Sequence, residues 1–152
     1  MFLKIVSVIV MSALLTGAGR MGPESDEIEQ YSPSVDEEYK MQINWIYNLQ
    51  EGLDAAAEKE KPLMVYFGAD WCVWCRRMEN ETYADPKVIE LSEYFVSVKI
   101  DTDDNPEVAR EYGVRGLPIV IFMDSDGEII ERVSGYRDGA AFASVMMSFV
   151  DR

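Results

Sequence analysis

The sequence of 152 residues contains no histidine and only two cysteines. Without histidine, catalysis by Ser-His-Asp or Cys-His arrangements and metal binding through imidazole are excluded. Two cysteines are also too few for a framework of several disulfides or for a four-cysteine metal site within one chain. Any chemistry of the protein must therefore come from these two thiols or from carboxylates, unless the protein performs none.

Basic residues are scarce as well. The chain has 14 Lys and Arg residues against 28 Asp and Glu residues, which gives a formal net charge of -14 and a pI near 4.3. Nucleic acids and anionic membrane surfaces bind patches of Lys and Arg, so neither is an expected partner. The length suits one domain, and the hydrophobic fraction of 48% is enough for a core.

The longest apolar run, from Ile5 to Leu15, follows a single lysine, Lys4, and precedes small residues. The run is shorter than the roughly 20 residues that a membrane-spanning helix needs. A positive start, an apolar middle and small residues at the end are typical of a secretory signal. We therefore predict a signal peptide over residues 1–18, with an uncleaved N-terminal anchor as the alternative.

Residues 19–40 are rich in Asp and Glu and include Pro and Ser. Low hydrophobicity with charge of one sign predicts a flexible acidic tether. The globular part is expected over residues 41–152. Because a signal peptide or an anchor precedes it, we expect this part outside the cytoplasm, in the periplasm or secreted.

From residue 41 onward, strand-like and helix-like patterns alternate. Strands are predicted over 43–47, 63–67, 95–100, 118–123 and 128–133, and helices over 48–60, 72–94, 106–113 and from Asp138 onward. The second helix is expected to bend near Asp85-Pro86 because proline lacks an amide donor. The order β-α-β-α-β-α-β-β-α predicts an α/β fold with a central mixed sheet and helices on both faces.

The two cysteines form a Cys-x-x-Cys motif, Cys72 and Cys75, where a predicted strand ends and a helix begins. Unpaired amides and the positive end of the helix dipole favour a thiolate at Cys72. The spacing puts the two α-carbons on the order of 5 Å apart, which permits a disulfide. Such a pair can cycle: Cys72 attacks a partner disulfide, and Cys75 then resolves the mixed disulfide. A structural disulfide, a zinc site shared by two chains and a pair of inert thiols are the alternatives.

The chain resembles the thioredoxin family, and within it the C-terminal extracytoplasmic thioredoxin-like domain of the thiol:disulfide interchange protein DsbD. The resemblance covers about residues 44–150. It is carried by residues 70–75 (Asp-Trp-Cys-Val-Trp-Cys), Glu79, Thr82, residues 85–88, residues 113–118 (Gly-Val-Arg-Gly-Leu-Pro), Gly135, Tyr136 and Asp138. It implies a thioredoxin-like fold and no dissociable cofactor. It also implies a cis Leu117–Pro118 bond beside the sulfurs, with the backbone of Leu117 pairing with an extended substrate segment.

Two positions depart from the family pattern. The buried Asp that usually lies six residues before the first cysteine is replaced by Tyr66, and the buried Lys of thioredoxin on the next strand aligns with Ser97. The usual proton acceptor is therefore missing. Glu79 follows Cys75 by four residues on the same helix face, and we expect it to take the proton of Cys75, directly or through water. The alternative is a solvated carboxylate on the helix surface.

Two tryptophans flank the thiols. Trp71 matches the family tryptophan and is expected to shield or position the site. Trp74 occupies a variable position of the motif and is expected to be partly exposed as an apolar contact for partners. Its alternative is inward packing against the helix.

The resulting prediction is an extracytoplasmic thiol:disulfide oxidoreductase, expected as a monomer, that reduces protein disulfides. The reducing direction rests on the resemblance alone, and it requires a separate electron donor, in the membrane or soluble. Contact with the membrane is expected only through an uncleaved N-terminal segment. A disulfide oxidant or isomerase and a non-catalytic interaction module with a structural disulfide remain as alternatives.

Overall fold

The computed structural model describes residues 42–150. The predicted signal peptide, residues 1–18, and the predicted tether, residues 19–40, lie outside the described residues. Within the described residues, no helix has both the length and the hydropathy needed to cross a membrane.

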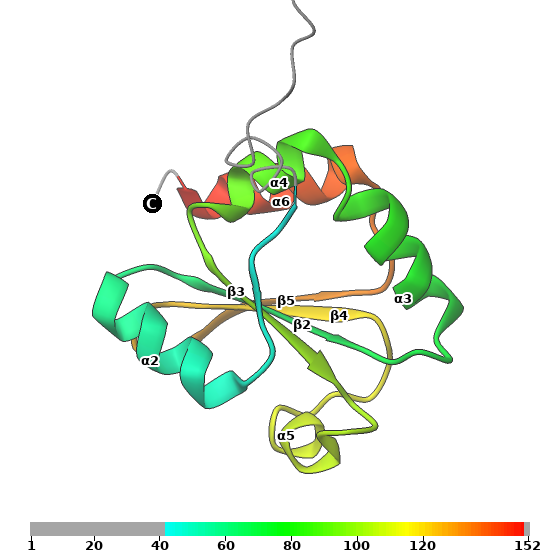
Figure 1. The fold of residues 1–152 in the computed structure, drawn as a ribbon, viewed down its shortest axis with the longest axis horizontal. Coiled ribbons are helices and arrows are strands. Elements are labelled where there is room, and N and C mark those ends of the chain that lie inside the picture. The colour runs from blue at the N-terminus through cyan, green and yellow to red at the C-terminus, as the bar shows by residue number, and fades with distance from the viewer. Residues whose placement is uncertain (1–41, 151–152) are drawn as a thin grey trace, which may run out of the picture. The chain divides into compact units, whose positions relative to one another are not determined.

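The described residues form five strands, with helices between and after them (Figure 1). The strands are β1 (Trp45–Ile46), β2 (Leu63–Gly68), β3 (Val96–Asp101), β4 (Ile119–Met123) and β5 (Ile129–Ser134). The helices are α2 (Leu49–Lys59), α3 (Val73–Arg77), the π-helix η1 (Met78–Thr82), α4 (Pro86–Ser92), α5 (Pro106–Glu111) and α6 (Gly139–Val150).

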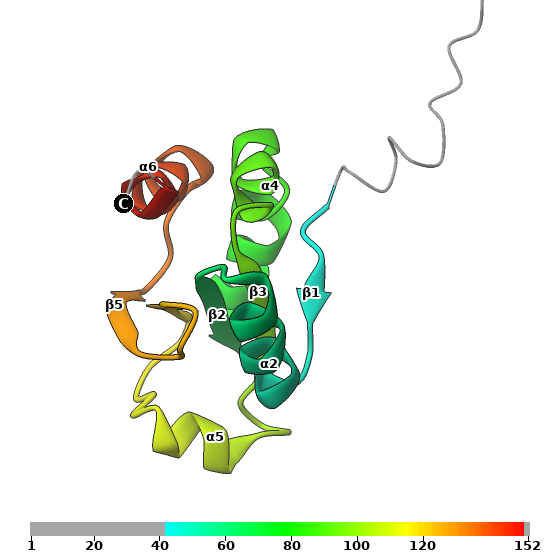
Figure 2. The same cartoon turned by 90° about the vertical axis from the view of Figure 1, so that its left-hand side faces the viewer.

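The strands make one mixed sheet in the order β1-β3-β2-β4-β5. Strands β1 and β2 each pair with β3 in parallel, whereas β4 is antiparallel to both β2 and β5. The turned view in Figure 2 shows β1 and β5 on opposite sides of the molecule, as the strand order requires. The central strand β2 is buried along its whole length, as expected of a strand with helices on both faces.

Each face of the sheet has its own hydrophobic core. Met64 and Tyr66 of β2 point into the core that α4 and α6 cover, whereas Leu63, Val65 and Phe67 point into the core beneath α2 and α5 (Figure 1). The alternation follows from the two-residue period of a strand. The predicted α/β fold, with a mixed sheet between two helical layers, is thus confirmed.

The helix predicted over residues 72–94 is wrong as a single element. The α-helical pattern stops at Arg77, and the bond from the Tyr83 N–H to the Met78 carbonyl (3.0 Å) closes the π-helix η1. A new helix, α4, then begins, because Asp85 accepts from the amides of Lys87 (2.8 Å) and Val88 (3.3 Å) and caps it. Proline is favoured at the first helical position, so Pro86 begins a helix here and does not bend one.

Gly52, in the middle of α2, is required by close packing on β3. A β-carbon at this position would lie 2.3 Å from Cγ2 of Val98, which is buried in the sheet. We predict that Gly52→Ala lowers the free energy of unfolding by about 1–3 kcal/mol because of this overlap, although alanine is the better helix former. Urea unfolding measures the change.

The matched control is Gly116→Ala, where an added β-carbon meets nothing within 4 Å; it should shift stability by less than about 0.5 kcal/mol. In the double variant Gly52→Ala/Val98→Ala the new methyl occupies vacated space, so the two changes should couple favourably. Equal effects of Gly52→Ala with and without Val98 would contradict the packing explanation.

Tyr83 carries a buried hydroxyl that has no hydrogen-bond partner among residues 42–150. Its ring packs edge-on against Trp45, Tyr66 and Phe142. Burial first, and then the nearby Tyr66 and Glu79, raise the pKa of Tyr83 well above its usual value of 10. The folded protein therefore holds this phenol neutral.

This burial predicts how stability changes in alkali. Below pH 10 both states keep the phenolic proton; above it only the unfolded state loses the proton, so stability falls by about 1.4 kcal/mol per pH unit for each such group. In Tyr83→Phe the fall should be shallower by that share, and stability at pH 7 should rise by about 1 kcal/mol because an unpaired buried hydroxyl is removed. Urea unfolding between pH 8 and pH 11.5 measures both effects. Tyr47→Phe, at a side chain 69% exposed, is the control; an unchanged slope in Tyr83→Phe would refute the prediction.

Candidate functional site

The candidate site lies at the edge of the sheet where β2 ends. Phe67 pairs with Ile119, so Pro118 lies level with Gly68, and the chain leaves this same edge to reach Cys72. The Leu117–Pro118 bond is cis, as the family resemblance implies. The Gly135 N–H, at the end of β5, donates to the Pro118 carbonyl (2.8 Å). Loops distant in sequence thus meet beside the cysteine motif.

The two cysteines form a disulfide with an S–S distance of 2.25 Å and a Cα–Cα distance of 5.1 Å. Cys72 is the N-cap residue of α3, with an extended backbone, and Cys75 lies inside that helix. The backbone N–H of Cys75 donates to Sγ of Cys72 (3.2 Å). An amide that donates to this sulfur at the start of a helix stabilises negative charge on Cys72 when the disulfide is reduced.

The burial of the two cysteines differs. Cys72 is 6% exposed and Cys75 is 0% exposed. Both cysteines are thus buried, and Cys72 is the one of the two that keeps some exposed area, which makes it the better placed to meet a partner sulfur, whereas Cys75 is placed to attack a bond that Cys72 has formed. The arrangement supports a two-step exchange in which the outer sulfur reacts first.

Three apolar residues next to the two cysteines are exposed. Trp71 is 65% exposed, Val73 is 64% exposed and Trp74 is 53% exposed. The Trp71 indole N–H donates to the Asp103 carboxylate (2.9 Å), which holds the ring in place. Three exposed apolar side chains next to a redox pair form a contact surface of the kind that binds protein partners.

Trp74 is exposed on one side and packed on the other. Its ring lies 5.7 Å from that of Tyr136, and the Arg77 guanidinium sits over both rings, at 5.7 and 4.8 Å. Arg77 and the Tyr136 hydroxyl also bind the Glu81 carboxylate, at 3.0 and 2.8 Å. Sequence reasoning assigned no such contact to Tyr136, although the residue belongs to the motif that carries the family resemblance.

Glu79 points toward the sheet. Its carboxylate accepts from the Tyr66 hydroxyl (3.0 Å) and pairs with the Lys99 ammonium (2.7 Å), while its side chain stays 34% exposed. No hydrogen bond joins Glu79 to either sulfur within the described residues. The expectation of a merely solvated carboxylate does not describe these contacts.

The strand register corrects one sequence assignment. The family lysine was aligned with Ser97, but Ser97 pairs with Met64, and it is Lys99 that pairs with Tyr66. A lysine is therefore present beside the position of the missing Asp, and it lies 5.9 Å from the centre of the Tyr66 ring. The alignment was off by two residues, a shift that keeps the same face of a strand.

Tyr66 acts as a donor in this cluster. Burial, and then the charge of Glu79 and its hydrogen bond, raise the pKa of the Tyr66 phenol well above its usual value. The hydroxyl is thus protonated at neutral pH and donates to Glu79. At this position the chain thus has a neutral group that donates to a carboxylate from the neighbouring helix.

Comparison with known proteins agrees with this geometry. A family model described as thioredoxin-like domain matches residues 49–149. The chain is 33% identical over 108 residues to the thiol:disulfide interchange protein DsbD of Vibrio vulnificus (strain CMCP6), covering 67% of this chain and 18% of that protein. It is 29% identical over 150 residues to DsbD of Salmonella typhi, covering 94% of this chain and 26% of that protein. The chain thus spans about a quarter or less of these relatives.

Solved structures show the same likeness. A thioredoxin from Thermus thermophilus superposes with a TM-score of 0.65 at 29% identity, covering 72% of this chain and 88% of that one. The oxidised DsbD C-terminal domain of Neisseria meningitidis superposes with a TM-score of 0.60 at 28% identity, covering 69% of this chain and 98% of that one. Since the family model spans more than half of the chain and the fold and cysteine motif agree with it, the chain belongs to the thioredoxin-like family.

Proposed function

We propose that this protein is an extracytoplasmic thiol:disulfide oxidoreductase that reduces protein disulfides. The observation that carries the proposal is the Cys72–Cys75 disulfide at the start of a helix, in which Cys72 keeps a 6% exposed fraction and Cys75 keeps none. A structural disulfide or a pair of inert thiols would not account for the amide that faces Sγ of Cys72. Nor would it account for the exposed apolar side chains of Trp71, Val73 and Trp74. Similarity to the DsbD proteins supports exchange with protein partners.

The proposed cycle balances as follows. The Cys72 thiolate attacks one sulfur of a partner disulfide, forming a mixed disulfide and releasing one partner thiolate. The Cys75 thiolate then attacks Sγ of Cys72, which forms the Cys72–Cys75 disulfide and releases the second partner thiolate. Two electrons pass to the partner. A separate dithiol donor, in the membrane or soluble, must then reduce the protein again.

The proline loop is the proposed docking element for the partner backbone. Leu117 precedes β4, and its N–H and carbonyl make no hydrogen bond within residues 42–150. An extended segment that pairs with these groups adds a short strand beside the sulfurs, which accepts varied sequences because it reads the backbone. Pro118, the next residue, is buried. Trp71 and Trp74 are proposed to contact the partner's side chains.

Substitution of each cysteine tests the proposed cycle. With a dithiol donor, the wild type should reduce insulin disulfides, and Cys72→Ser should fall to the uncatalysed rate because the attacking thiolate is removed. Cys75→Ser should instead form a mixed disulfide with the substrate that persists until a reductant is added, because nothing resolves it. Turbidity and mass spectrometry follow the two outcomes. A wild type no faster than Cys72→Ser would remove the enzyme and leave a binding module.

The reduction potential decides the direction of electron flow. A value near or below that of thioredoxin, about -270 mV, supports a reductase, whereas one well above roughly -200 mV supports an oxidant or isomerase. Equilibration with glutathione buffers, followed by alkylation of free thiols, gives the value.

Glu79 is proposed to accept the proton of Cys75, through water. It belongs to the segment that follows Cys75, and Tyr66 and Lys99 each bind one of its oxygens. Tyr66 and Cys75 belong to the same buried cluster, so the tyrosine links the carboxylate to the core beneath the resolving thiol. A base held near that thiol raises the fraction that is thiolate during the resolving step.

Substitution of Glu79 tests its role as the base. Glu79→Gln keeps the shape of the side chain but removes its basicity, so resolution of the mixed disulfide at pH 7 should slow by about tenfold or more and recover as pH rises. Stopped-flow measurement between pH 6 and pH 10 records the profile. Glu90→Gln, at an exposed ion pair with Lys87, is the control and should keep the wild-type profile. The same profile in Glu79→Gln would show that Glu79 has no such part.

A further inference from the structure

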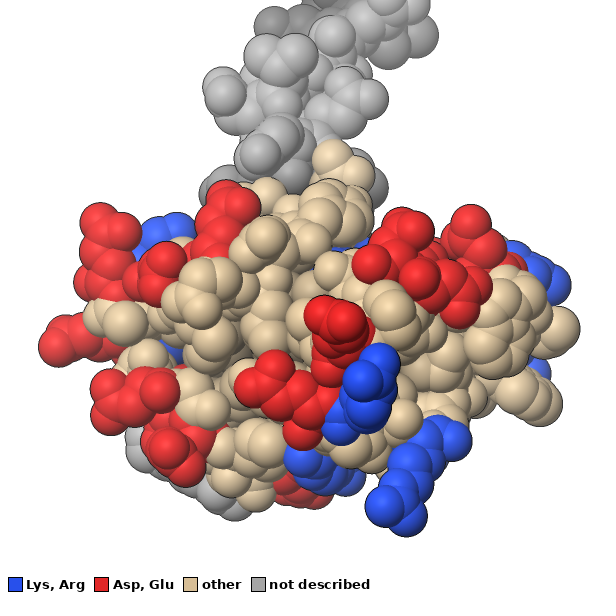
Figure 3. All heavy atoms as spheres, turned by 90° about the horizontal axis from the view of Figure 1, so that it is seen from below, with Lys and Arg blue, Asp and Glu red and all other residues tan. Residues whose placement is uncertain are grey.

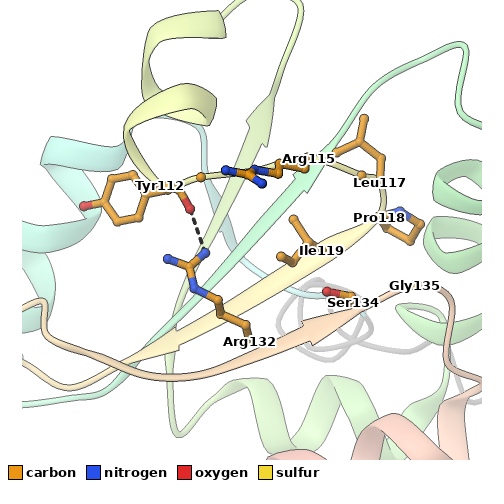
Figure 4. Close-up of a pocket in the computed structure, with 10 residues that line it drawn as sticks. Tyr112, Arg115, Leu117, Pro118, Ile119, Arg132, Ser134 and Gly135 are labelled. Atoms are coloured by element: carbon orange, nitrogen blue, oxygen red, sulfur yellow. Dashed lines mark hydrogen bonds between the residues drawn. The ribbon is translucent and has the colours of Figure 1, made fainter.

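A groove runs from the proline loop toward the end of α5 (Figure 4). It has a volume of about 560 Å³ and lies between the segment that joins α5 to β4 and the last residues of β5. Leu117 and Pro118 form one end of it, and Tyr112, Arg115 and Arg132 lie towards the other (Figure 4). A segment that pairs with Leu117 therefore has this groove as its continuation.

The charge of the groove is opposite to that of the protein. Its lining includes two arginines, Arg115 and Arg132, and no Asp or Glu, in a chain where acidic residues outnumber basic ones by 28 to 14. On the face seen from the α5 side, acidic side chains are widespread and the basic ones gather in a few places (Figure 3). A local excess of positive charge on such a surface marks a site for an anionic group.

The two guanidinium groups are open to a ligand. Arg132 donates one hydrogen bond to the Tyr112 carbonyl (2.7 Å), which positions the group and leaves its other donors free. Arg115 is exposed and makes no hydrogen bond or ion pair with residues 42–150. The adjacent Glu131 belongs to the other face of the sheet, because it pairs with Phe122 whereas Arg132 pairs with Ile121.

We propose that this groove binds acidic side chains that flank the reactive cysteine of the partner. The preferred substrates are then disulfide proteins with Asp or Glu in an extended segment on one side of that cysteine. Arginine binds carboxylates through two parallel hydrogen bonds, and an extended chain carries side chains outward from the site at about 3.3 Å per residue. The proposal rests on the proposed function, since it assigns the substrate class of the same site.

The net charge of the protein and the charge of the groove favour opposite classes of peptide. A net charge of -14 repels acidic peptides and attracts basic ones over long distances. The groove favours acidic ones at contact. A preference for acidic substrates thus cannot arise from the average charge of the surface.

The experiment uses the full chain, reduced, and three peptide disulfides that are identical except for Glu, Gln or Lys on both sides of the cysteines. At low salt the Glu peptide should react about fivefold faster than the Gln peptide, and the Lys peptide should be slowest, with the differences shrinking at high salt. Arg115→Gln/Arg132→Gln should lose the preference, so that the Glu and Gln peptides react at equal rates with this variant. Arg110→Gln/Lys59→Gln changes the net charge equally at exposed positions outside the groove and should keep the preference.

Three outcomes would overturn the inference. The wild type could react fastest with the Lys peptide, or the groove and control variants could lose the preference equally, which would leave only long-range charge. In the third outcome, the preference for the Glu peptide appears only after the Asp and Glu residues of 19–40 are replaced by Asn and Gln. That result would make this acidic segment, and not a partner, the occupant of the groove. The single variant Arg115→Gln is a control for misfolding of the double variant, since the Arg115 side chain makes no hydrogen bond or ion pair with residues 42–150. No reaction with any peptide would instead refute the proposed function.

Discussion

The antiparallel pairing of β4 with β2 is the constraint on which the rest of the site depends. Because Ile119 lies opposite Phe67, the proline loop is fixed level with the end of β2, where the cysteine helix starts. The two segments are far apart in sequence, and only burial of β2 on both faces holds their register. A slip of one residue would turn the core side chains of β4 to the wrong face and move Pro118 away from the sulfurs.

Two separate groups of charged and polar side chains lie near this edge of the sheet. On the α3 side, the neutral phenol of Tyr66 and the ammonium of Lys99 hold the carboxylate of Glu79. On the α5 side, Arg115 and Arg132 line a groove that leads away from the proline loop. One of these regions is proposed for proton transfer and the other for recognition of the partner.

Much of the fold followed from local patterns. The alternation of strands and helices, the capping residues and the turn before β5 predict the correct order of elements, because each reports a local backbone preference. The expectation for residues 72–94 failed where two local signals compete: Asp85 and Pro86 start a helix better than they continue one, and the π-turn at Met78–Thr82 leaves no periodic trace in so short a segment. The alignment of the family lysine failed because only strand pairing decides between Ser97 and Lys99.

By itself the sequence excluded chemistry that needs histidine or more than two cysteines, and it placed two thiols one helical turn apart as the leading candidates. It also determined that the protein is strongly acidic. The tertiary structure decided how deeply each cysteine is buried, which partners Glu79 has, and that two arginines from different segments line one groove. These facts depend on contacts between residues distant in the chain, and such contacts form only when both faces of the sheet are covered and its register is set.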